Sequence, residues 1–140
     1  MNLFLILDVL PHLLDGALLT IELTVTAIAA GFLIAVPLSL LRASPAFFIS
    51  APVQFYTFLF RGTPLLVQLF LIYYGASQIG WLRTGPAWVV LRNPFGCALI
   101  AFSLNHAAYA TEILRGAICA VPRGEVEAAK ALGMSTFFPL

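Results

Sequence analysis

Long stretches without a charged side chain constrain this chain more than any other feature. Residues 23–41 and 62–82 carry no Asp, Glu, Lys or Arg, and residues 95–114 carry only Glu112. Because a helix rises about 1.5 Å per residue, each stretch is long enough to cross a hydrocarbon core of about 30 Å. Charged residues make up 9% of the chain, against about 25% in soluble domains, and hydrophobic residues make up 61%. These values exclude soluble and disordered chains and predict an all-α integral membrane protein.

Three transmembrane helices are predicted from these stretches. They cover about residues 20–41, 64–81 and 95–114. The first contains Pro37, which membrane helices tolerate. The second follows Thr63, which we expect to cap the helix with Pro64 in its first turn. This second helix ends in aromatic residues that are typical of the membrane interface.

The uncharged stretch at residues 43–60 is long enough for a further crossing but is interpreted differently. Ser44 and Pro45 are typical of a helix start. Pro52 is expected to break the stretch into two halves, because proline interrupts the helical hydrogen bonds. Two short pieces suit an elbow helix in the membrane interface, or a helix packed against the bundle, better than a crossing.

The distribution of basic residues predicts the orientation of the chain. Loops on the cytoplasmic side carry an excess of Lys and Arg. With the N-terminus outside, five basic residues fall on the inner side and two on the outer side. The inner set is Arg42, Arg61, Arg115, Arg123 and Lys130, and the outer set is Arg83 and Arg92. We therefore expect a multi-pass protein with its N-terminus outside.

Three blocks of the sequence resemble a known family of membrane proteins. They read FRGTPLLVQ at residues 60–68, AYATEILRGAI at 108–118 and VPRGEVEAAKALGM at 121–134. In this order they are similar to the permease subunits of ATP-binding-cassette (ABC) importers for polar amino acids. The histidine, lysine, arginine and opine type is the most similar sub-group, and the last block is similar to the family's EAA loop.

The resemblance implies a partial type I importer permease fold over residues 1–134. This fold has three transmembrane helices, an interfacial elbow helix and a cytoplasmic coupling helix, the last within a loop at residues 123–134. The resemblance also implies a subunit of the bacterial inner (plasma) membrane that translocates polar or basic amino acids. Its implied partners are ABC ATPase subunits, a second permease subunit in a homo- or heterodimer, and a periplasmic or extracytoplasmic substrate-binding protein.

The end of the chain departs from the pattern of this family. Members of this type are usually longer, and residues 135–140 are atypical of the sequence that follows an EAA loop. We therefore expect a permease truncated after that loop. The alternative is a membrane-inserted but transport-inactive fragment. The sequence does not indicate which amino acid or opine is carried.

The EAA-like block contains the residues that the resemblance assigns to ATPase coupling: Glu127, Ala128, Ala129 and Gly133. The small alanine side chains allow a short helix to approach a groove closely. Glu127 can pair with Lys130 or with a charge on a partner. Gly133 is placed for a left-handed turn after the helix. Composition alone would equally fit an amphipathic surface helix with a glycine cap.

The third predicted span carries the candidates for a substrate path. Asn105, Tyr109 and Glu112 lie within about 60° of one another on one helix face. Polar groups are costly in hydrocarbon, so this face should look into the bundle or a water-filled path. Either substrate contact or helix–helix hydrogen bonding would explain it, and Glu112 could simply pair with Arg115. His106 lies off this face and is expected to pack.

Two further polar residues are expected to have structural roles. Arg61 is placed at the inner membrane interface beside a helix start. Gln68, one turn into the second predicted span, is expected to form an interfacial or interhelical hydrogen bond, with a place in a polar path as the alternative.

The sequence contains no motif for catalysis, metal binding or a cofactor. It lacks the GxxxxGK[ST] loop, so ATP hydrolysis is expected in a partner chain. Cys97 and Cys119 form no CxxC pair and are expected to be small packing residues. No basic stripe indicates nucleic-acid binding. An ion-coupled secondary carrier would require internal repeats, and the sequence has none.

Overall fold

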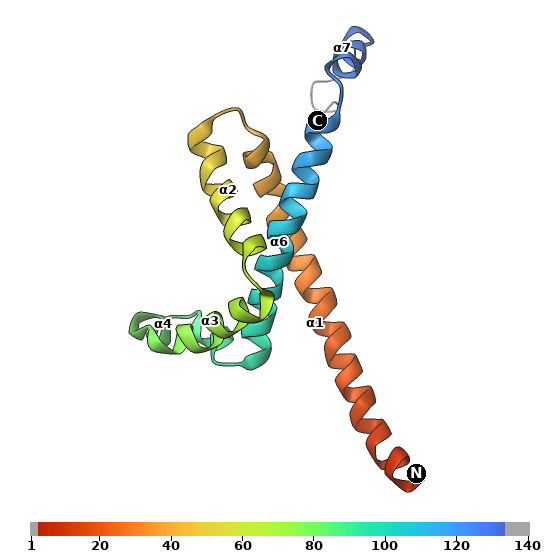
Figure 1. Cartoon of the computed structure of the whole chain (residues 1–140), viewed down its shortest axis with the longest axis vertical. Helices are drawn as coiled ribbons and strands as arrows, with labels where there is room; N and C mark the ends of the chain where they lie inside the picture. Colours follow the sequence, from red (N-terminus) through yellow and green to blue (C-terminus); the bar gives the residue numbers. More distant parts are fainter. Residues whose placement is uncertain (1–2, 134–140) are drawn as a thin grey trace.

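The computed structural model describes residues 3–133, and each regular element in that range is a helix (Figure 1). The helices are α1 (Leu3–Ala43), α2 (Phe47–Gly62), α3 (Leu65–Gln78), α4 (Gly80–Thr84), α5 (Trp88–Leu91), α6 (Pro94–Ala120) and α7 (Arg123–Ala131). The end segment that we describe as atypical, residues 135–140, lies outside the described residues.

Two long helices, α1 and α6, form the frame of the molecule. Val9–Ala43 and Pro94–Ala120 are each long and apolar enough to cross a membrane. They run in the same general direction, and the middle of α6 crosses the C-terminal half of α1 (Figure 1). Small side chains are buried where they meet, every fourth residue along each helix. These are Ala27, Gly31, Ala35 and Ser39 on α1 and Ser103, Ala107 and Thr111 on α6.

Close approach of the two backbones explains why these residues are small. A Cβ atom added to Gly31 would lie 2.8 Å from the carbonyl oxygen of Ser103 and 2.9 Å from Cδ2 of His106. Helices in lipid associate through packing of this kind, since the hydrophobic effect gives no advantage to apolar contact there. The contact also confirms that His106 packs against α1.

The middle of the chain forms a bent pair of helices, α2 and α3. α2 returns along α1 and α6, and α3 then turns away at an angle of 105° (Figure 1). Only together are the two helices long and apolar enough for a membrane span. α2 contacts α1 and α6, as expected of a helix packed against the bundle, but it can also form half of a crossing, so the expectation that residues 43–60 do not cross stays a prediction.

The predicted break at Pro52 is wrong, because α2 continues through this residue. The helix ends instead before Pro64, where Thr63 is extended with φ −111° and ψ 141°. A proline disfavours the helical conformation of the residue before it, which explains the position of the break. The cap prediction is also wrong, since Pro64 precedes α3 and no side chain caps that helix.

The predicted span ends differ from the helix ends. α1 begins at Leu3 rather than near residue 20, and α6 continues to Ala120. The span predicted at residues 64–81 is interrupted, because Ile79 is extended between α3 and α4. α3 has 14 residues, about 21 Å of helix, which is too short to cross the hydrocarbon core alone.

The last described helix, α7, lies beyond the end of α6 and away from the bundle (Figure 1). It is followed by Gly133, whose φ of +79° is left-handed. The amide of Gly133 donates to the carbonyl of Lys130 at 3.0 Å. The predicted glycine cap is therefore confirmed.

Candidate functional site

The polar face of α6 meets three other helices. Glu112 lies at one end of it and accepts hydrogen bonds through both carboxylate oxygens. Oε1 receives Arg42 Nε of α1 at 3.2 Å and Thr57 Oγ1 of α2 at 3.0 Å, and Oε2 receives Arg115 Nε at 2.8 Å. The Glu112 side chain is only 14% exposed. One carboxylate thus ties α1, α2 and α6 together.

The pairing of Glu112 with Arg115 is confirmed, but the bond to Arg42 is one that sequence reasoning missed. The two residues are 70 positions apart in the chain, so no local spacing indicates the contact. Arg42 also donates through Nη1 to Ser50 Oγ at 2.8 Å. It therefore fixes the end of α1 against the first turn of α2.

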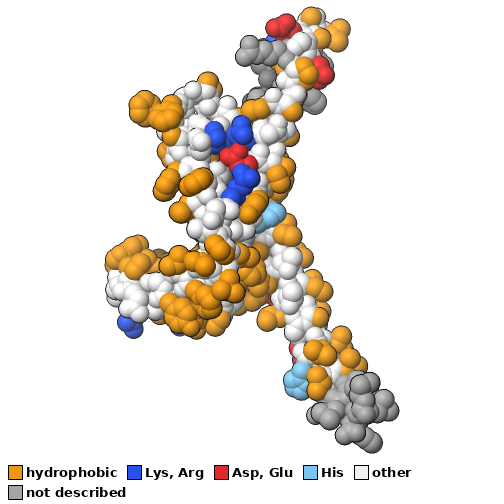
Figure 2. Space-filling model, in the orientation of Figure 1, with side chains coloured by type: hydrophobic (Ala, Val, Ile, Leu, Met, Phe, Trp, Pro, Cys, Tyr) orange, Lys and Arg blue, Asp and Glu red, His pale blue; other side chains and the backbone are white. Residues whose placement is uncertain are grey.

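A polar groove of about 450 Å³ lies between α2 and α6. Figure 2 shows basic side chains gathered around acidic ones at this place. Tyr109 lies one turn from Glu112, and the guanidinium of Arg61 stacks over its ring at 5.4 Å. Arg61 was expected at the inner interface beside a helix start, and the structure places it in this groove. The lining residues are Arg42, Gln54, Thr57, Phe58, Arg61, Gly62, Tyr109 and Glu112.

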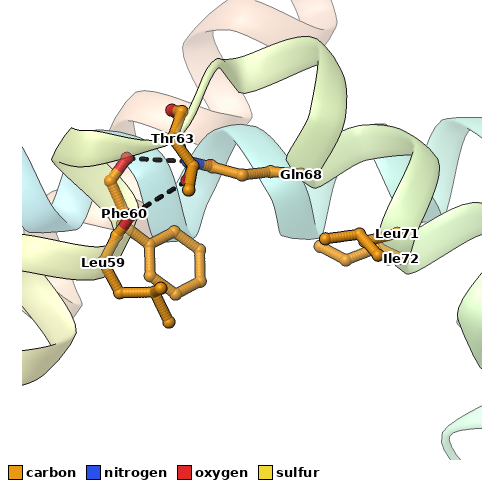
Figure 3. Close-up of a pocket in the computed structure, with 6 residues that line it drawn as sticks. All are labelled: Leu59, Phe60, Thr63, Gln68, Leu71 and Ile72. Atoms are coloured by element: carbon orange, nitrogen blue, oxygen red, sulfur yellow. Dashed lines mark hydrogen bonds between the residues drawn. The ribbon is translucent and has the colours of Figure 1, made fainter.

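The bend between α2 and α3 is held by a buried amide (Figure 3). Nε2 of Gln68 lies 2.7 Å from the carbonyl of Phe60, and 2.7 Å and 3.0 Å from the hydroxyl and carbonyl of Thr63. The last carbonyls of a helix have no hydrogen-bond partner within that helix. Here the side-chain amide of Gln68 donates to one of them, the carbonyl of Phe60 in α2. The predicted interhelical hydrogen bond of Gln68 is therefore confirmed.

Asn105 connects this bend to α6. Its Nδ2 donates to Gln68 Oε1 at 3.1 Å and to the Phe60 carbonyl at 3.4 Å. Beside the bend is a small, mainly apolar pocket of about 150 Å³, lined by Leu59, Phe60, Thr63, Gln68, Leu71 and Ile72 (Figure 3). All three α6 candidates therefore face other helices: Asn105 contacts α2 and α3, Tyr109 contacts α2, and Glu112 contacts α1 and α2.

The ATPase-coupling candidates lie apart from the contacts between α6 and the bent pair α2–α3 (Figure 1). Glu127, Ala128 and Gly133 are exposed on and after α7, and Ala129 is half-buried. The two cysteines also differ: Cys97 is buried in α6, as expected of a packing residue, whereas Cys119 is exposed. Within residues 3–133, no group of three His, Cys, Asp or Glu side chains is placed to hold a metal.

Residues 27–137 match the family described as binding-protein-dependent transport system inner membrane component. The chain belongs to this family. The resemblance predicted from the three sequence blocks is thereby confirmed, and so is an integral protein of the inner membrane.

Individual relatives extend the comparison. The octopine transport system permease protein OccM of Rhizobium meliloti is 49% identical over 123 residues, covering 88% of this chain and 50% of the relative. The arginine ABC transporter permease protein ArtM of Haemophilus influenzae is 40% identical over 128 residues, covering 91% and 56%. The chain thus spans about half the length of these curated relatives.

A solved structure supports the same fold. The crystal structure of an amino acid ABC transporter with histidines matches with a TM-score of 0.78 and 33% identity. The match covers 99% of this chain and 61% of that one. The helical arrangement in Figure 1 is therefore similar to part of a chain of that transporter, over nearly the whole length of the present chain.

Proposed function

We propose that this chain forms at least part of the membrane permease of an ABC importer that takes up amino acids or opines. The observation that carries the proposal is the family match over residues 27–137. The printed functions of the relatives, octopine and arginine transport, suggest the substrate class. The energy would come from ATP hydrolysed by a separate subunit.

The topology supports this proposal. Because α1 and α6 run in the same direction, two crossings by them require the intervening chain to return through the membrane (Figure 1). Only the bent pair α2–α3 is long and apolar enough for that return. Arg61 then lies within the middle crossing, which leaves four basic residues on the side of α7 and two on the other. An excess on the side of α7 favours an outside N-terminus.

The exposed helix α7 is the proposed contact with the ATPase. The side chains of Glu127 and Ala128 are exposed, and Gly133 after the helix has a left-handed φ of +79°. A short helix that projects from a membrane domain can transmit movement to a soluble partner. Glu127, Ala128, Ala129 and Gly133 are the residues assigned to this contact.

The seam between α6 and the bent pair is the proposed solute path. Asn105, Tyr109 and Glu112 form its polar wall. Asn105 and Glu112 hydrogen-bond to groups on α1, α2 and α3, and Tyr109 lies under the guanidinium of Arg61 on α2. A path between helices can open when those helices separate. ATP binding would favour one arrangement of the helices and hydrolysis the other, as in alternating access. A second permease subunit and a substrate-binding protein would complete the assembly.

Uptake measurements test the proposed function. A strain lacking the gene is compared with the same strain carrying it again, using radiolabelled arginine, lysine, histidine and octopine. Restored uptake of at least one of these solutes, abolished by depleting ATP, supports the proposal. A chain that reaches the membrane but restores no uptake would be the transport-inactive fragment, and it would overturn the transport proposal.

A further inference from the structure

A pocket of about 200 Å³ lies where α3 contacts α5, away from the polar groove and from α7. It combines aromatic, apolar and charged side chains. The lining residues are Tyr73, Tyr74, Ser77, Trp88, Leu91 and Arg92. Tyrosine and tryptophan are typical of the membrane interface, and an arginine there can keep its charged end among polar groups. The pocket therefore has the composition expected at the level of the lipid headgroups.

Arg92 supplies the charge of this pocket and has no acidic partner in the described part of the chain. Its side chain is exposed, and both ion pairs between described residues are made by Glu112 instead. Residues 23–111 contain no Asp or Glu, so no acidic side chain lies near Arg92 in the sequence either. A guanidinium group offers parallel N–H donors that match the oxygens of a phosphate. Arg92 is therefore available to an anionic group.

The aromatic rings of the pocket raise the alternative of a cationic choline headgroup, since cations bind over aromatic faces. Trp88 already has such a partner, because the guanidinium of Arg83 lies over its ring at 5.9 Å. A further cation would be repelled both by Arg83 and by Arg92 in the lining. The pocket therefore favours a headgroup with a net negative charge over a choline headgroup.

An exposed apolar stripe on α3 leads away from the pocket. It consists of Leu66, Phe70 and Tyr74, which share one helix face because they are spaced four residues apart. The rings of Phe70 and Tyr74 stack with centroids 5.8 Å apart. Because Tyr74 also lines the pocket, one ligand with a charged head and an apolar tail can contact both features.

We propose that this pocket binds the headgroup of an anionic phospholipid. Arg92 binds the phosphate, and the stripe of Leu66, Phe70 and Tyr74 carries an acyl chain. A pocket of about 200 Å³ suits a headgroup, while the chains remain in the bilayer along α3. The inference requires an integral membrane protein but no transport, so it stands or falls separately from the proposed function.

Titration of the purified chain with single lipids tests this inference. The chain is kept in a neutral detergent, and native mass spectrometry measures the affinity for the first bound lipid. We expect phosphatidylglycerol to bind about tenfold more tightly than phosphatidylcholine, the usual gain from a charge-assisted hydrogen-bond pair. Arg92→Gln should remove most of this difference without weakening the binding of phosphatidylcholine. Arg92→Lys keeps the charge but loses the planar fork, and it should lie between the two.

A matched control separates a built site from a general loss of positive charge. Arg83 lies close to the same pocket, over the Trp88 ring, but does not line it. Arg83→Gln removes the same charge and should keep most of the preference for phosphatidylglycerol. Equal losses in Arg83→Gln and Arg92→Gln would show that surface charge alone attracts the lipid, and would overturn the site.

Three other results would also overturn the inference. Tighter binding of phosphatidylcholine than of phosphatidylglycerol would identify a choline site formed by the aromatic rings. Displacement of phosphatidylglycerol by inorganic phosphate would identify a site for the free anion. Disulfide cross-linking of two chains through Phe70→Cys, in a Cys119→Ser background, would show that a second copy covers the stripe instead of lipid.

Discussion

Replacing Gly31 by alanine tests the packing of α1 on α6. The added Cβ would lie 2.8 Å from a backbone oxygen and 2.9 Å from the His106 ring, whereas ordinary contacts exceed 3.4 Å. The helices must therefore separate by about half an ångström or more, and overpacking of this kind costs about 1–3 kcal/mol. Alanine in place of glycine within a helix returns about 0.5–1 kcal/mol. We expect a net destabilisation of up to about 2.5 kcal/mol.

Gly16 provides the matched control, because it lies in the same helix with nothing within 4 Å of an added Cβ. Gly16→Ala should stabilise the chain slightly, by about 0.5–1 kcal/mol. The free energy of unfolding is measured by titration with SDS in mixed micelles, followed by circular dichroism. If Gly31→Ala is as stable as Gly16→Ala, α1 and α6 do not approach as closely as described.

Three further substitutions test separate parts of the structure. Glu112→Ala removes an acceptor shared by three donors, and we expect the same titration to show a free energy of unfolding lower by about 2–4 kcal/mol. Glu125→Ala, at an exposed site, should leave the free energy of unfolding unchanged. Equal stabilities of the two variants would contradict the role of the carboxylate. Gln68→Leu should speed amide hydrogen exchange at the end of α2, but not in α1, relative to the wild type. Unchanged exchange at the end of α2 would contradict the hydrogen bonds of Gln68 across the bend. Gly133→Val strains a backbone with φ of +79° and should reduce co-purification of the ATPase without reducing membrane insertion; full retention would argue against the coupling turn.

Local patterns in the sequence predict the helical features that depend on near neighbours. The shared face of Asn105 and Glu112 follows from helical periodicity, and the left-handed turn at Gly133 follows from its place after a polar helix. The family follows from three blocks in one order. Each of these signals is contained within a short segment, so no tertiary information is needed to recognise it.

Features that depend on distant contacts were not predictable in the same way. The bond between Arg42 and Glu112 joins residues 70 positions apart, and nothing near either residue indicates the other. The proline signals were also ambiguous. Pro52 and Pro64 both lie within apolar stretches, but they have different effects. α2 continues through Pro52, whereas the chain bends at Pro64, where Gln68 donates to the carbonyls of Phe60 and Thr63.

Mapping the two sides of the membrane tests the central claim most directly, namely that α1, the bent pair and α6 make three crossings. Reporter domains are fused after Arg42, Thr84 and Lys130, each of which lies at or beyond the end of a predicted crossing. We expect the fusions at Arg42 and Lys130 to report the cytoplasm and the fusion at Thr84 to report the outside. A cytoplasmic signal at Thr84 would contradict the account, because α1 and α6 could not then cross the membrane in the same direction with the bent pair returning between them.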